Sequence, residues 1–530
     1  MQTSMDVVTR IPRGLRPVPL FRPVRALLFL VTTLALALPI RAQFVAPSQP
    51  QTTQAVQLPL SGRTSQSNGT VKATESPIAG LTNSVNTLNS TVQVEGVYTG
   101  STPGTAQRPF SGALGFREAI QRALAYNLGQ TNATQTVRQA EGQSHAMRSV
   151  LLPNFNGTVT EDAQTTDLRA LGFRSKLLPL PEVIGPFNYV DFRAHLTQTV
   201  LDFTAINNYR ATGDVARANR YSAEDARDLI VLAVGGAYLQ TSAAKARLAS
   251  EQAQVDAANA LYQQSVQQLN RGLIAKVDAD RNEVQVLTEQ QRLLSLQNDY
   301  AKQKINLARM IGLPPNDHYE IIDEIPYAPG GPLTIEDALT QAFEHRSDLK
   351  AAKTQMQAAE RSRTAARAEQ YPSLSINADY GGIGVNPSQL QTTFTAVATL
   401  KIPIWQGGRA QADIEQADAA FTQRRAEYED LKGQIESDVR SAFLDLTAAG
   451  SQVEVAQRNL QVSREAAELT HQKLEAGVST TVDYTQAEQA VTAAEFDLIN
   501  AVFAHNIAKL SFSRAIGRAA DALPQFLKLP

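Results

Sequence analysis

The sequence predicts a mainly α-helical chain with a smaller β-sheet part, built from two copies of one plan. Segments of the first half match segments of the second half in the same order, at offsets that drift between 219 and 204 residues. Roughly 65 residues without proline precede Gly272, and their apolar and small residues recur at spacings of three and four, which indicates a long coiled-coil helix. Shorter segments alternate polar and apolar residues, which indicates half-buried strands.

Residues 1–42 are an expected signal peptide. Five arginines precede the segment "ALLFLVTTLALAL", Ala26 to Leu38, which carries no charge. Thirteen residues are too few to span a bilayer comfortably but suit the apolar core of a signal peptide. Cleavage is expected after Ala42, and the alternatives are a buried helix or a short anchor. We therefore expect the mature chain to be exported.

Composition limits the class of protein. The formal net charge of −2 gives no electrostatic case for nucleic acid. The chain has no cysteine, which excludes disulfides, thiol catalysis and a lipidated N-terminal cysteine, and its six histidines are scattered. No metal or cofactor is expected. Residues 43–110 are polar with sparse apolar residues, so they are expected to form a disordered or loosely draped linker.

The two copies are expected at residues 111–320 and 321–520, followed by a tail at 521–530. "LGFREAIQRALAYN" at Leu114 resembles "LTIEDALTQAFEHR" at Leu333, and "ARMIGLP" matches "SRAIGRA" near the ends of the copies. Each copy is expected to run helix, strand, loop, strand, long helix, break, helix. The first copy has the longer loop, between Pro153 and Leu196.

The expected strands each have one apolar face. In the second copy the apolar positions are Leu374, Ile376, Ala378 and Tyr380, then Phe394, Ala396, Ala398, Leu400 and Ile402; in the first copy they are Val190, Phe192, Ala194 and Leu196. Strands of about ten residues can cross a bilayer, and a soluble sandwich gives the same alternation.

The long helices have matching seams. One seam is Val234, Ala237, Thr241, Ala244, Leu248, Glu251, Val255, Ala258, Tyr262, Ser265 and Leu269. The other is Val439, Ala442, Leu446, Ala449, Val453, Ala456, Leu460, Ser463, Ala467, Thr470 and Leu474. Each helix is expected to be a rod of ~100 Å, and the seams are expected to serve packing rather than chemistry.

Four strands per chain cannot close a membrane barrel, which needs about eight. An open sheet in lipid would leave its edge groups without hydrogen bonds. If the strands enter a membrane they must therefore pool across subunits. Two chains give eight strands and three give twelve, and the strand count does not choose between them.

The doubled order resembles the TolC-family outer-membrane efflux proteins over about Leu114 to Gly517. The opening helices, the prolines before the first strands, "LTQTVLD" and "IPIWQGG" at the strand-to-helix junctions and two glycine-to-aspartate breaks carry the resemblance. It implies a homotrimer in the outer membrane of a Gram-negative-type bacterium, with a twelve-stranded barrel and a twelve-helix periplasmic tunnel. It also implies a passive conduit, not an enzyme, that contacts outer-membrane lipid and docks a periplasmic adaptor and an inner-membrane pump such as an RND or ABC transporter.

The resemblance makes each break the turn of a helical hairpin at the periplasmic end. The breaks lie in "LNRGLIAKVDADRNEV" and "LEAGVSTTVDYTQAEQ", where Asp278 and Asp483 match at an offset of 205. These carboxylates either cap the descending helices or gather at the aperture. The residues expected to form the tips and dock the adaptor are Gly272, Leu273, Ile274, Ala275, Gly477, Val478, Ser479 and Thr480.

The chain departs from the family at the closed end. Where relatives often latch that end with an arginine and a tyrosine, this chain has Ser479 and Leu474, and Gln486 replaces a second aspartate. The rival interpretations are a coiled-coil scaffold of the cell envelope and an enzyme. No phosphate-binding loop, zinc-binding helix or nucleophile elbow supports an enzyme.

Overall fold

The computed structural model describes residues 70–78, 87–102, 112–168, 181–314, 318–322, 327–328, 333–476 and 478–519. The expected signal peptide and C-terminal tail lie outside these residues.

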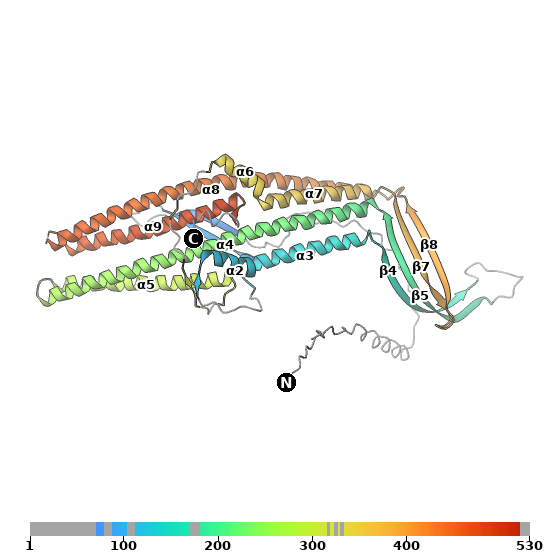
Figure 1. Cartoon of the computed structure of the whole chain (residues 1–530), viewed down its shortest axis with the longest axis horizontal. Coiled ribbons are helices and arrows are strands. Elements are labelled where there is room, and N and C mark those ends of the chain that lie inside the picture. The colour runs from blue at the N-terminus through green and yellow to red at the C-terminus, as the bar shows by residue number, and fades with distance from the viewer. Residues whose placement is uncertain are drawn as a thin grey trace, which may run out of the picture. The chain divides into compact units, whose positions relative to one another are not determined.

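The chain repeats one succession of elements (Figure 1). The first copy is α2 (Phe116–Tyr126), α3 (Leu128–Ser149), β4 (Asn154–Asp167), β5 (Val183–Leu201), α4 (Phe203–Asn270) and α5 (Lys276–Met310). The second is α6 (Ile335–His345), α7 (Ser347–Ala368), β7 (Ser373–Gly384), β8 (Gln391–Lys401), α8 (Arg409–Glu475) and α9 (Thr481–Ala515). The two-residue strands β3 (Ala113–Leu114) and β6 (Glu320–Ile321) pair in parallel.

One detail of the expected succession differs. Two helices, not one, precede the strands in each copy, because Asn127 and Arg346 take non-helical backbone conformations with ψ of 137° and 120°. Asn127 then caps α3, since its side-chain oxygen accepts a hydrogen bond from the Gly129 N–H at 2.9 Å.

The four long strands form one antiparallel sheet in the order β4-β5-β7-β8. The β5–β7 pairing joins the two copies. Leu374 pairs with Leu400 and Tyr380 pairs with Phe394, so the expected apolar positions fall on one continuous face. The strands β4 and β8 are the two edges.

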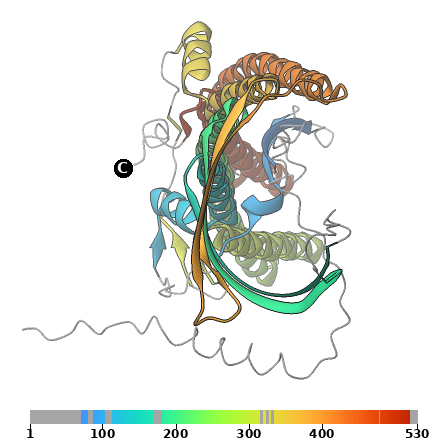
Figure 2. The ribbon, with the colours of Figure 1, turned by 90° about the vertical axis from the view of Figure 1, so that its right-hand side faces the viewer.

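The helices form a layer that is four helices wide at each level. Near the sheet, α3, α4, α7 and α8 pack side by side in that order. Farther from the sheet the order is α5, α4, α9, α8. The long helices α4 and α8 run through both levels, whereas α5 and α9 take the places of α3 and α7. The layer and the sheet curve in the same sense, and α2 and α6 lie on the convex side (Figure 2).

The two distal hairpins pair along the expected seams, but their chemistry differs. In the hairpin of α8 and α9 the buried seam is apolar and includes Val453, Ala456 and Ala494. In the hairpin of α4 and α5, Glu251 lies opposite Glu289 where the second copy has Ala456 and Ala494. Burial and the Glu289 carboxyl raise the pKa of the Glu251 carboxyl to about 7.

Closer to the tip of the same hairpin, the Asn282 amide donates to the Ser265 hydroxyl at 2.5 Å. The second copy has Ala487 and Thr470 at these positions. The seam of α4 and α5 is therefore partly a hydrogen-bonded polar network, and the seam of α8 and α9 is not.

A buried arginine ties the second copy together. Arg346, between α6 and α7, is 5% exposed. Its guanidinium contacts Asp348 at 2.6 Å and Asp438 of α8 at 3.2 Å. The chain after α9 passes so close that a Cβ at Gly517 would lie 2.7 Å from the Arg346 backbone nitrogen. Gly517 also has a positive φ of 74°, so glycine is required there on two grounds.

Part of the expected linker is ordered, which corrects that expectation. Within 43–110 the structure describes β1 (Val71–Ile78), β2 (Thr87–Val94) and a 3-10 turn at Gly96–Thr99. Val71 and Tyr98 are buried against the helical layer, so a few apolar residues suffice to hold this segment on a large apolar surface.

Candidate functional site

The apolar face of the sheet is exposed in the chain. Phe155, Val159, Tyr380, Phe394 and Leu400 have between 59% and 73% of their surface exposed. Among the described residues no second sheet covers them. This is the reverse of a soluble sandwich, where the apolar face is the covered one.

The opposite face of the sheet is polar and internally paired. The Arg193 guanidinium contacts the Asp191 carboxylate at 2.9 Å. His195 pairs with Asp379 of the neighbouring strand, and Thr158 lies 2.9 Å from the other ring nitrogen of His195. Strands with one apolar face outward and one polar face inward are the pattern of a membrane barrel wall with an aqueous interior.

Aromatic side chains mark the boundary between sheet and helices. Trp405, the single tryptophan, is 87% exposed just after β8, beside Ile404 at 94%. Tyr371 precedes β7 and stacks edge-on against Phe203, with ring centroids 6.1 Å apart. Aromatic residues at this level are typical of a membrane interface.

The first tip is a glycine-dependent turn. Gly272 has a φ of +70°, a conformation that L side chains rarely adopt. The Leu273 N–H donates to the Gln268 carbonyl and the Gly272 N–H donates to the Leu269 carbonyl, both at 2.9 Å. This is a Schellman cap. It leaves the Leu273 side chain 69% exposed.

The second tip repeats this hydrogen bonding. The Val478 N–H donates to the Lys473 carbonyl at 2.9 Å, as Leu273 does to Gln268 in the first copy. Gly477 itself lies outside the described residues. Val478 is 78% exposed, so each tip presents one apolar side chain to solvent. The two tips are separate ends of two hairpins (Figure 1).

This arrangement of paired repeats, exposed sheet and long hairpins matches known proteins. A family model described as outer membrane efflux protein matches residues 119–313 and 338–518, more than half of the chain. The chain belongs to this family. Outer membrane efflux proteins are channel proteins of the Gram-negative outer membrane with a periplasmic extension. The family predicted from the sequence is confirmed.

Individual relatives agree with this assignment. OprJ of Pseudomonas aeruginosa is 27% identical over 429 residues, which cover 76% of this chain and 84% of OprJ. The cobalt-zinc-cadmium resistance protein CzcC of Cupriavidus metallidurans is 26% identical over 206 residues, which cover 39% of this chain and 47% of CzcC. The solved CmeC channel of Campylobacter jejuni has a TM-score of 0.66 at 15% identity, covering 86% of this chain and 97% of CmeC, which shows the fold.

In this outer membrane efflux protein the two aspartates have different local roles. Asp483 is not the N-cap of α9, because Thr480 is. The Asp483 N–H donates to the Thr480 hydroxyl at 3.2 Å, and the Thr480 N–H donates to the Asp483 carboxylate at 3.0 Å, which completes a capping box. Hydrogen bonds from the Thr480 side chain, the Thr480 backbone and Ser479 lower the pKa of the Asp483 carboxyl.

Asp278 has no such box. It lies in the first turn of α5, whose N-cap residue Ala275 has no side chain that could cap. The Asp278 carboxylate lies 3.4 Å from the Arg281 guanidinium, which offsets its charge. Asp278 and Asp483 lie in the first turns of α5 and α9, at the ends of two separate hairpins (Figure 1).

Sequence reasoning missed a contact near the second tip. The His471 ring of α8 lies 5.1 Å from the Tyr484 ring of α9, centroid to centroid. Burial raises the pKa of Tyr484 to about 12, so its hydroxyl stays protonated. The first copy has Val266 and Ala279 at these positions, so the repeat pattern alone gave no signal for this pair.

Proposed function

We propose that this chain forms the outer-membrane channel of a tripartite efflux or secretion system, as a homotrimer with a twelve-stranded barrel and a twelve-helix tunnel. In this proposal residues 1–42 are removed on export. The tips dock a periplasmic adaptor, and an inner-membrane pump supplies the energy. The single observation that carries the proposal is a pair of complementary free edges on the chain.

The free edges lie on opposite sides of the chain. In the sheet they are β4 and β8. In the helical layer, α3 and α5 are the outermost helices on one side, and α8 is the outermost helix on the other. When β4 of one chain pairs with β8 of the next, α5 meets α8 of that next chain. Such a head-to-tail contact closes into a ring, which leaves no strand edge in lipid.

Both outer helices expose a stripe of large apolar residues at heptad-like spacings. On α5 the stripe is Val277, Val284, Leu287, Leu294 and Ile305, each at least 50% exposed. On α8 it is Leu444, Val455, Val462 and Leu469, each at least 47% exposed. Uncovered stripes of this kind on a helix are typical of a coiled-coil seam that lacks its partner.

The two stripes match in height. Val284, Leu287, Leu294 and Ile305 lie 8, 11, 18 and 29 residues from the tip end of α5 at Lys276. Leu469, Val462, Val455 and Leu444 lie 6, 13, 20 and 31 residues from the tip end of α8 at Glu475. Corresponding residues therefore differ in height by two positions, ~3 Å along a helix. This agreement supports a coiled coil between neighbouring chains.

Cysteine cross-linking tests the ring, because the native chain has no cysteine. We expect the double variant Leu287→Cys, Val462→Cys, treated with a short bis-maleimide, to give covalent dimers and trimers on a denaturing gel. Each single variant should give none, because a head-to-tail contact places α5 against α8 and never against another α5. A cross-linked dimer from either single variant, or only monomer from the double variant, would contradict the proposed ring. Cross-linked products no larger than a dimer would instead favour a ring of two chains with eight strands.

The aperture carboxylates give a second test. Threefold assembly brings three copies of Asp483 to the narrow end, each kept ionised by its hydrogen bonds. We expect Asp483→Asn to lower the cation selectivity of single channels in planar bilayers and to weaken block by multivalent cations, because a ring of carboxylates favours cations. Thermal stability should hardly change, because the asparagine oxygen can still accept the Thr480 N–H bond. Wild-type selectivity in this variant would leave Asp483 with the capping role alone.

A further inference from the structure

The ribbon of β1 and β2 is docked on the helical layer at a defined place. Val71 pairs with Val94 and Ala73 with Val92, and these residues pack against the apolar cluster of α4 and α9. Gly236 of α4 makes room for Val92, since a Cβ at Gly236 would lie 2.5 Å from the Val92 side chain. A larger residue at position 236 would therefore displace Val92 of the ribbon.

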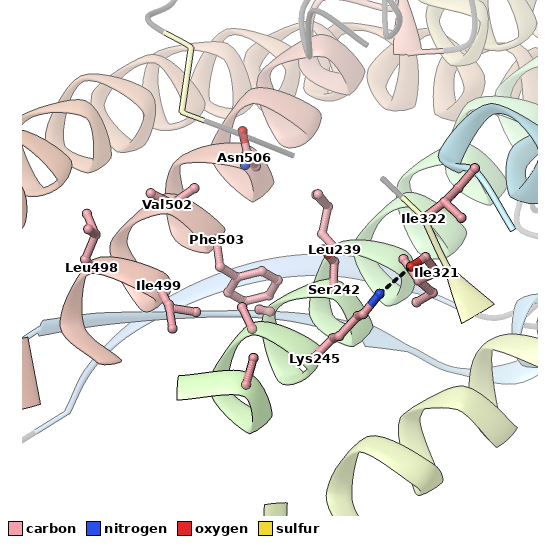
Figure 3. A pocket seen from close by; sticks show the side chains of 13 residues that line it. Leu239, Ser242, Lys245, Ile321, Ile322, Leu498, Ile499, Val502, Phe503 and Asn506 are labelled. Atoms are coloured by element: carbon pink, nitrogen blue, oxygen red, sulfur yellow. Dashed lines mark hydrogen bonds between the residues drawn. The ribbon is translucent and has the colours of Figure 1, made fainter. Parts of the chain in front are cut away.

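The segment after the ribbon is also held. Tyr98 is 4% exposed, and its carbonyl accepts a hydrogen bond from the buried Asn127 amide at 2.9 Å. The ribbon passes behind Leu239, Ile499 and Phe503, which also line a cavity of about 320 Å³ between α4, α9 and β6 (Figure 3). The ribbon thus covers an apolar surface of the helical layer.

The ribbon lies on the concave side of the curved layer, opposite α2 and α6 (Figure 2). In a ring of three chains the concave side faces the bore. We propose that the three ribbons stand inside the tunnel and narrow it at the level where α4 and α9 pack together. This inference rests on the proposed ring, and it adds an internal constriction that is separate from the hairpin tips.

Dimensions support a real narrowing. Twelve helices spaced ~9–10 Å apart form a ring ~36 Å across between axes, which leaves a bore of ~25 Å after subtracting one helix diameter. A two-stranded ribbon with its side chains is ~10 Å across. Three ribbons would therefore occupy more than half of the cross-section.

The face of the ribbon toward the bore is polar near its anchored end. Lys72 and Gln93 form a cross-strand pair between the anchoring residues and are exposed. Successive side chains of a strand point to opposite faces. Because Val92 and Val94 face the helices, Gln93 and Lys72 point away from them, into the space that would be the bore.

Cross-linking at Gln93 tests the location. Three Gln93→Cys thiols inside the bore would lie within ~15 Å of one another, given the dimensions above. We expect a bis-maleimide of that span to link two or three chains. The matched control is Glu336→Cys, exposed on α6 on the convex side, which should give no links. Absence of links from Gln93→Cys, in an assembly that still forms the Leu287–Val462 cross-link when those cysteines are present, would overturn the inference.

A deletion tests the narrowing. The Glu95 N–H donates to the Thr70 carbonyl at 2.9 Å, so the two ends of the ribbon meet and residues 71–94 can be replaced by a short Gly-Ser link. We expect the deletion to raise single-channel conductance by up to about twofold, from the area estimate above. Unchanged conductance would overturn the constriction even where the Gln93 links form. Failure of the proposed ring would appear separately, as loss of the Leu287–Val462 cross-link.

Discussion

Replacing both Leu273 and Val478 with glutamate should abolish efflux while leaving the assembled channel intact. The two side chains are 69% and 78% exposed at the tips, so they contribute little to folding. An apolar residue displayed on a rigid turn is a typical anchor for a partner surface, and six buried carboxylates per ring would oppose docking. In a strain that depends on this channel, we expect export of the channel's substrate to fall to the level of the strain without it.

The control is the pair Leu273→Met and Val478→Met, which keeps an apolar side chain at each tip and should retain most of the efflux. Both double variants should yield the same amount of the assembled channel in the outer-membrane fraction. Normal efflux by the glutamate variant would show that the adaptor does not dock at these tips. Loss of the assembled channel in the glutamate variant would show that the tips serve assembly.

Replacing Arg346 with leucine should clearly lower the stability of the folded chain. Arg346 is buried, and it holds Asp348 and Asp438 with contacts of 2.6 and 3.2 Å. Breaking a buried ion pair costs ~3–5 kcal/mol. We expect a loss at or below the lower end of that range, because the Asp438 side chain is 42% exposed and Arg514 still acts on Asp348. We expect a clear fall in the denaturant midpoint of the purified protein, measured by circular dichroism.

The matched control is Arg440→Leu on the neighbouring helix face. Arg440 pairs with Glu436 at 2.8 Å, but the two side chains are 51% and 49% exposed. Water screens such a pair, so its loss should cost no more than ~0.5 kcal/mol. Equal midpoints for the two variants would mean that the Arg346 cluster does not join the two helices as inferred.

The periodic parts of this chain could be predicted from sequence. The seams were readable because burial against one partner helix imposes a spacing that repeats over many turns. The strand faces were readable for the same reason, with a period of two. The breaks at Gly272 and Asp278 were readable because the duplication shows the layout twice.

The remaining features depend on partners that are distant in sequence. The ribbon at Val71 and Val92 has little apolar surface of its own and is held by α4 and α9, more than a hundred residues away. Glu251 was placed in its seam correctly, but nothing local indicated that Glu289 would lie opposite. Thr480, three residues before Asp483, is the true cap, and the Thr-x-x-Asp spacing was present as a signal.

The difference between the two hairpin seams sets how the periplasmic end responds to force. A dry seam of alanine, valine and leucine resists separation of its helices, because parting them exposes apolar surface to water. The polar seam of α4 and α5 loses less on parting. Water can replace the hydrogen bond between Asn282 and Ser265 and can solvate the buried carboxyl of Glu251. In the proposed ring of three chains, stiff α8–α9 hairpins would alternate with more easily separated α4–α5 hairpins. A force on the hairpin tips would therefore first separate α4 from α5.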